Sequence, residues 1–84
     1  MEQLQLVVVK WNDAQDHEQK WVDAEDIQAF NDIEVTVTSV GFLVRKTDKY
    51  ITLAGDYDPI DNDYGRVTKI PAGMVQEIKP VSME

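Results

Sequence analysis

Apolar and polar residues alternate along short stretches of this chain, which is the pattern of β-strands that bury one face. In the longest stretch, residues 33–45, Val35 and Val37 alternate with polar neighbours, and Val40 and Phe42 continue one residue out of phase. A shift of one residue turns side chains to the opposite face unless a bulge or bend absorbs it. The pattern therefore predicts one long strand that is bent near its middle.

The bend is expected between Ser39 and Gly41, because glycine tolerates the backbone distortion that a bend requires. A long bent strand is how a small sheet curls toward a barrel. Shorter apolar runs predict four further strands, at residues 4–11, 50–54, 66–70 and 74–79. Clusters of turn-forming residues predict turns at 46–49 and 71–73 and a long loop at 55–65.

Residues 21–30 are compatible with either a short helix or an irregular connection. Asp23 is a suitable N-cap, and Glu25 and Asp26 follow where the helix dipole favours negative charge. The segment is short, so both interpretations stay open. The polar stretch before it, residues 12–20, predicts a loop.

Five short strands with one helical or irregular excursion near the start predict a mostly-β domain of the small five-stranded SH3-like or Sm-like barrel type. A chain of 84 residues has room for one core, so residues 1–84 are expected to form a single domain. That core is expected to comprise Leu6, Val8, Val35, Val37, Phe42, Val44, Ile51, Leu53, Val67, Ile70, Val75 and Ile78. The chain has no cysteine, so no disulfide bond can stabilise this core. Small domains without disulfide bonds often gain stability by self-association, so we expect a homo-oligomer.

The net negative charge of the chain bears on which partners it can bind. Sixteen acidic residues face eight basic ones, for a net charge of −8, which disfavours direct binding to nucleic acid because phosphate backbones attract lysine and arginine. The apolar run at residues 6–9 is too short for an export signal or a membrane span. We therefore expect a cytoplasmic protein with no membrane partner.

Basic residues on three strands that should be neighbours are the first candidate site. They are Arg45, Lys46, Lys49, Arg66 and Lys69. If they face the same way, they form a basic patch for a small anion such as a nucleotide, with Arg45, Lys46 and Arg66 holding phosphates. Tyr50 or Trp21 would then stack on the base. The competing interpretation is ordinary charge balance between strands.

An acidic stretch with two aromatic residues is the second candidate site. Its residues are Asp56, Tyr57, Asp58, Asp61, Asp63 and Tyr64. The spacing does not match a calcium-binding EF-hand loop, and tyrosines of this kind favour interfaces, so a partner-contact role is preferred over a metal. The simpler interpretation is a solvated loop whose aspartates support turns.

Catalytic and cofactor motifs are not recognisable in the sequence. The four glycines are scattered singly and form no phosphate-binding loop, and there is no nucleophile-elbow motif. We therefore expect a protein that is not an enzyme and has no cofactor and no metal.

Several segments carry a resemblance to known proteins. Trp11-Asn-Asp13-Ala14, Ser39-Val-Gly41-Phe-Leu-Val, Ile51-Thr-Leu and Ile70-Pro71-Ala-Gly73-Met74-Val-Gln-Glu-Ile78 resemble segments of short, mostly uncharacterised phage- or prophage-encoded proteins. The last two-thirds of the chain is also similar in pattern to Sm-like domains. The phage resemblance implies a protein that blunts a function of the host cell, such as an anti-defence protein, and it assigns no functional residue.

Two mechanisms for such a binding protein stay open. A homo-oligomer could sequester a small signalling nucleotide between its subunits, held by the basic residues. Alternatively, the acidic surface could mimic nucleic acid and block a host protein. A small structural or regulatory subunit of a phage assembly is a third class.

Overall fold

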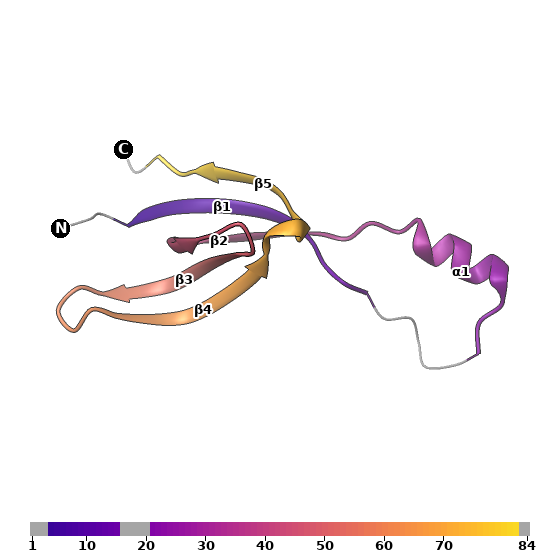
Figure 1. Ribbon diagram of the computed structural model, residues 1–84, viewed down its shortest axis with the longest axis horizontal. Coiled ribbons are helices and arrows are strands. Elements are labelled where there is room, and N and C mark those ends of the chain that lie inside the picture. The colour runs from indigo at the N-terminus through magenta and orange to yellow at the C-terminus, as the bar shows by residue number, and fades with distance from the viewer. Residues whose placement is uncertain (1–3, 16–20, 83–84) are drawn as a thin grey trace.

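The computed structural model describes residues 4–15 and 21–82. Its elements, in chain order, are β1 (Gln5–Asn12), α1 (Ala24–Asn31), β2 (Thr36–Lys46), β3 (Tyr50–Asp58), β4 (Asp63–Pro71), the 3-10 helix η1 (Ala72–Met74) and β5 (Val75–Pro80). The five strands form one antiparallel sheet in the order β4-β3-β2-β1-β5 (Figure 1). The predicted mostly-β class is confirmed. The sheet is not closed into a barrel, because β4 and β5 are its two edges.

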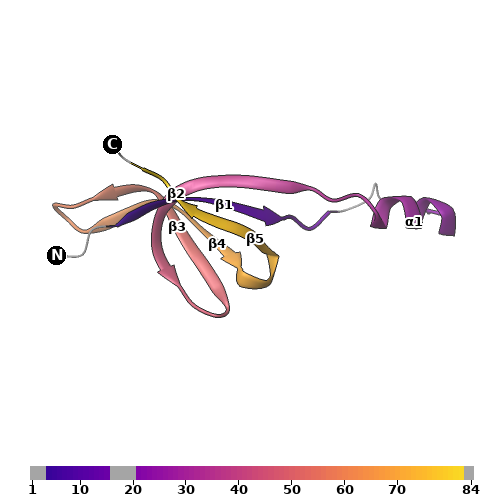
Figure 2. The same ribbon diagram turned by 90° about the horizontal axis from the view of Figure 1, so that it is seen from above.

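A short connection between the two edge strands requires the sheet to curl. Four inter-strand spacings would separate the edges of a flat five-stranded sheet by about 19 Å. Only the three residues of η1 link β4 to β5, and such a link spans at most about 14 Å. The sheet therefore curls so that its edges approach each other at this end, and Figure 2 shows the strong turn that β2 makes on its way to β3.

The break in register within β2 lies at Val44, not between Ser39 and Gly41 as predicted. Leu43 pairs with Leu53 and Arg45 with Thr52, so two residues of β2 advance against one residue of β3. Val44 is the extra residue of this bulge. Bulges bend a strand and increase its twist, which accounts for the curvature that the alternation pattern predicted.

The core is small and lies on one face of the sheet. The buried residues that cluster there are Val7, Val9, Ile51, Leu53 and Ile70. Ala54 is also buried, but it follows Leu53 directly in β3 and so lies on the opposite face. Ile51, Leu53 and Ile70 were predicted correctly, and the other expected core residues apart from Val67 are half-buried.

Two details of the predicted core are wrong. Val7 and Val9, rather than Leu6 and Val8, are the buried residues of β1. The run from Leu6 to Val9 is apolar at every position, so its sequence does not reveal which alternate residues face inward. Val67 is 55% exposed, because it lies three residues from buried Ile70 and side chains three apart in a strand point to opposite faces.

The predicted long loop at 55–65 is instead most of a β-hairpin. β3 continues to Asp58 and β4 begins at Asp63, so only residues 59–62 form the turn. Asp58 accepts a hydrogen bond from the Ile60 backbone N–H at 2.9 Å, and Asn62 adopts the left-handed region with φ of 58°. Asparagine tolerates that region well. The turn therefore occupies only the tip, and Gly55, Gly65 and the acidic residues on either side of the tip lie in the strands.

The segment between β1 and β2 contains a helix, α1. The sequence of residues 21–30 was compatible with either a short helix or an irregular connection, and the structure has the helix. Asp23 is its N-cap, and its carboxylate accepts a hydrogen bond from the Asp26 backbone N–H at 2.8 Å. The helix lies beyond the end of the sheet (Figure 1). Part of the loop predicted at 12–20, residues 16–20, lies outside the described residues. In the described part of the chain, no helix is long and apolar enough to cross a membrane.

Gly41 provides a test of the packing of β2 against β3. A Cβ atom at this buried position would lie 2.9 Å from the Ala54 carbonyl oxygen and 3.3 Å from the Leu53 Cβ. Backbone on the neighbouring strand cannot retreat without disturbing the ladder, so Gly41→Ala is expected to lower the free energy of unfolding by about 1–3 kcal/mol. Urea unfolding followed by circular dichroism measures this.

Gly73→Ala is the matched control, because a Cβ at Gly73 meets no atom within 4 Å. It is expected to leave the free energy of unfolding unchanged or slightly raised, since alanine restricts the unfolded chain. Equal losses in the two variants would contradict the close approach of β2 and β3 at Gly41.

Candidate functional site

Three side chains form a row across neighbouring strands on the outer face of the sheet. Arg45 of β2 lies opposite Thr52 of β3, and Thr52 lies opposite Lys69 of β4. Directly opposed residues on adjacent strands have side chains on the same face, about 5 Å apart at Cβ. The row therefore places one cation on each side of a threonine.

The turn from β2 to β3 holds further polar groups beside this row. The Thr47 hydroxyl oxygen accepts hydrogen bonds from the backbone N–H groups of Lys49 and Tyr50, at 3.2 and 3.1 Å. The Thr47 backbone N–H in turn donates to the Tyr50 carbonyl at 2.9 Å. Ala72 of η1 donates its N–H to the Lys49 carbonyl at 2.8 Å, which ties the turn to the β4–β5 connection. These bonds fix the positions from which Lys49 and Tyr50 extend.

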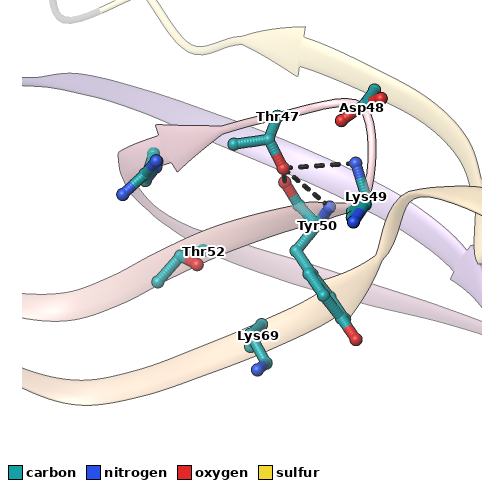
Figure 3. A pocket seen from close by; sticks show the side chains of 7 residues that line it. Thr47, Asp48, Lys49, Tyr50, Thr52 and Lys69 are labelled. Atoms are coloured by element: carbon teal, nitrogen blue, oxygen red, sulfur yellow. Dashed lines mark hydrogen bonds between the residues drawn. The ribbon is translucent and has the colours of Figure 1, made fainter.

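The row and the turn together border an open pocket of about 530 Å³ (Figure 3). It is lined by Arg45, Thr47, Asp48, Lys49, Tyr50, Thr52 and Lys69. The volume lies within the range of small-molecule sites. The Lys69 ammonium lies 4.4 Å from the centre of the Tyr50 ring, a cation–π contact that holds the lysine over one face of the ring.

The pocket is the part of the described surface where positive charge is concentrated. Its three cations face one acid, Asp48, although the whole chain carries a net charge of −8. Within the described residues, Arg45, Lys49 and Lys69 form no ion pair with a carboxylate. Three other cations are paired within the fold, Lys10 and Lys79 with Glu77 and Arg66 with Asp56. Lys46 has no ion pair among the described residues, but it lies outside the pocket. The pocket cations are thus available to an external anion.

Arg66 was expected in the basic patch but lies away from the pocket. Its guanidinium donates two hydrogen bonds to the Asp56 carboxylate, at 2.8 and 3.1 Å, and lies over Gly55. The arginine backbone is left-handed, with φ of 49°, a conformation that costs a residue with a Cβ roughly 1 kcal/mol or more. The Arg66 hydrogen bond and charge hold the pKa of Asp56 below its ordinary value, and Asp56 raises the pKa of Arg66.

Two other predicted ligand residues also lie outside the pocket. Lys46 follows Arg45 directly, and successive side chains of a strand point to opposite faces, so Lys46 does not line the pocket. Trp21 precedes α1 and is fully exposed at 101%. Of the five ligand residues predicted from the sequence, the structure therefore brings together Arg45 and Tyr50.

The remaining lining residues were partly visible in the sequence. Lys49 and Lys69 belonged to the expected patch but were not assigned a role. Thr47, Asp48 and Thr52 were not predicted as site residues. The polar turn at 46–49 was a usable signal for Thr47, whereas Thr52 is recognisable only from the strand register.

The acidic candidate residues lie along the β3–β4 hairpin. The rings of Tyr57 and Tyr64 stack with centres 5.1 Å apart, and the Tyr57 hydroxyl donates to the Asn62 side chain at 3.0 Å. Asp56 is neutralised by Arg66, while Asp58, Asp61 and Asp63 remain exposed. Among the described residues, no group of three or more acidic or histidine side chains is arranged to hold a metal ion.

Comparisons with protein-family models, with curated protein sequences and with solved structures find no match. The functional argument therefore rests on the geometry and charge of the pocket.

The ion pair between Asp56 and Arg66 gives a testable pH dependence. Because the pKa of Asp56 is lowered in the folded protein, the pair stabilises the fold above the ordinary aspartate pKa and the effect is lost as pH falls through the lowered value. Removing the guanidinium in Arg66→Gln is expected to raise the pKa of Asp56, as measured by the pH dependence of its side-chain carbon chemical shift in NMR spectra. An unchanged Asp56 titration in this variant would contradict the pairing.

Proposed function

We propose that this protein is a non-catalytic binding protein that holds a small phosphorylated ligand of the nucleotide class in the pocket between β2, β3 and β4. The observation that carries the proposal is the set of three unpaired cations around one tyrosine ring on an otherwise acidic molecule.

The chemistry of the pocket suits both parts of a nucleotide. Arg45 can form paired hydrogen bonds with phosphate oxygens, and Lys49 and Lys69 add point charges that favour a di- or triphosphate over a monophosphate. Lys69 lies over one face of the Tyr50 ring, and Tyr50 is 41% exposed, so part of its surface is available for contact with a base. The only acid in the lining is Asp48 and the Thr47 hydroxyl is engaged in the turn, so the lining favours holding a ligand over converting it.

The proposed cellular role is sequestration of a signalling nucleotide by a phage- or prophage-encoded protein in the host cytoplasm. The resemblance to short phage proteins supports this role, and a protein that works by occupancy needs no catalytic group. For the fold, we propose the small SH3-like or Sm-like barrel type. The four-stranded meander, the bulged β2, the single 3-10 turn after β4 and the return of β5 to β1 support it.

A matched pair of arginine substitutions tests the pocket. Arg45→Ala is expected to weaken binding of a nucleoside triphosphate by about 10- to 100-fold, the effect of losing charged hydrogen bonds worth about 1.5–3 kcal/mol. Arg66→Ala removes the same side chain from the same sheet but outside the pocket, and is expected to change binding less than threefold. Isothermal titration calorimetry with ATP, GTP and cyclic dinucleotides measures both, after native mass spectrometry has identified any ligand that co-purifies.

Equal effects of the two substitutions would contradict the pocket assignment, as would the absence of binding to any nucleotide tested. In that case the acidic hairpin becomes the better candidate for partner contact, through Asp58, Asp61 and Asp63. The combined substitution of these three aspartates by asparagine would then abolish capture of a host protein, whereas under the sequestration mechanism it leaves nucleotide binding intact.

A further inference from the structure

An acidic arm, residues 21–35, extends from the sheet between β1 and β2. None of the residues of its helix α1 is buried, and both views show α1 beyond the end of the sheet (Figures 1 and 2). Gln76 fixes the base of the arm, because its amide donates hydrogen bonds to the side chains of Asn12 and, at 3.1 Å, Glu34. The arm is thus held at its root and presents its outer part to the surroundings.

The arm exposes three large apolar side chains, one in α1 and one on each side of it. Trp21 is 101% exposed, Ile27 56% and Ile33 59%. Helices shorter than about 12–15 residues are marginal in water, and most helical stability in proteins comes from packing an apolar face. The Asp23 cap contributes only about 1 kcal/mol. The helix of the arm is therefore expected to be stabilised by packing against another surface.

The chain itself carries a surface of matching character. The arm contains five acidic residues and no basic one. On the outer face of β4, exposed Val67 lies two residues before Lys69 and shares its face, with Arg45 and Lys49 across the pocket. Apolar and basic groups on the sheet thus complement apolar and acidic groups on the arm.

We propose that the arm of one copy docks on the outer β3–β4 face of a second copy, and that the second arm docks reciprocally in a closed two-fold dimer. No arm residue lines the pocket of its own chain, because the arm extends away from the sheet, so a second copy supplies the surface. Two-fold exchange makes each interface twice and leaves no complementary surface open. The attraction is local, since charges farther apart than about 8 Å are largely screened at physiological salt.

This inference does not depend on the proposed function, because it concerns the ligand-free protein. The docked arm and a bound polyphosphate would use the same cations, so each is expected to exclude the other.

Sedimentation velocity of the full chain without ligand tests the dimer. The molar mass obtained for the wild type is expected to be twice the 9.6 kDa of one chain. Ile27→Asp is expected to raise the dimer dissociation constant at least tenfold. Ile60→Asp is the matched control: Ile60 is 91% exposed at the hairpin tip, and this substitution should leave the dimer intact. A monomeric wild type, or equal effects of the two substitutions, would overturn the proposal.

An exchange of charges between the arm and the sheet tests whether the arm docks on a second copy of this chain. One variant reverses the arm, with Glu25→Lys, Asp26→Lys and Asp32→Lys, which changes the arm's net charge from −5 to +1. The other reverses the sheet, with Lys49→Glu and Lys69→Glu. Each is expected to be monomeric alone, because its arm and sheet then carry like charges, while an equimolar mixture is expected to recover the dimer. Circular dichroism confirms that each variant is folded. A mixture of folded variants that stays monomeric, or variants that still dimerise alone, would overturn reciprocal docking.

Discussion

The bulge at Val44 is the constraint on which both the fold and the candidate site depend. In an unbroken ladder continuing from the pair Leu43–Leu53, Val44 would lie opposite Thr52, and Arg45 would lie opposite Ile51, whose side chain is buried. A guanidinium directed to that face would lose its hydration without a partner. The extra residue shifts the register by one, so that Arg45 joins Thr52 on the outer face while β2 bends. One inserted residue therefore both curls the sheet and completes the cationic row.

Separation of the charges explains how an acidic protein can offer a site for anions. Glu77 engages two lysines and Asp56 engages Arg66, so these pairs are satisfied within the fold. The pocket cations have no such partner among the described residues. Because screening limits charge interactions to about 8 Å, a small anion in the pocket interacts mainly with these cations. A long polyanion would also meet the acidic surroundings, which is consistent with selection for a small ligand over nucleic acid.

The sequence predicted features that depend on neighbouring residues better than features that depend on register. Alternation identified the bent strand, and the Asp23 cap identified the start of the helix. The face of β1 was predicted wrongly because an unbroken apolar run does not show which alternate residues face inward. The hairpin at 55–65 was missed because the pairing of Tyr57 with Tyr64 across the strands is not visible in local turn propensity. Arg45 and Tyr50 were placed in the candidate site, whereas Arg66 could not be excluded from it. Its ion pair with Asp56 joins two strands, and its left-handed backbone conformation cannot be predicted from the composition of the chain.

The pocket and the arm are coupled through the cations that they share. If a ligand neutralises Arg45 and Lys69, the docked arm loses its electrostatic partners, and linkage requires that docking weakens ligand affinity by the same factor. The arm is the element most suited to such exchange, because none of its helix residues is buried within the chain and release costs no core packing. The clustered core residues, Val7, Val9, Ile51, Leu53 and Ile70, lie on the opposite face of the sheet from the pocket, so neither occupant disturbs them. The same cations of the sheet can in this way bind either the acidic arm of a second copy or a free anionic ligand, without a change of fold.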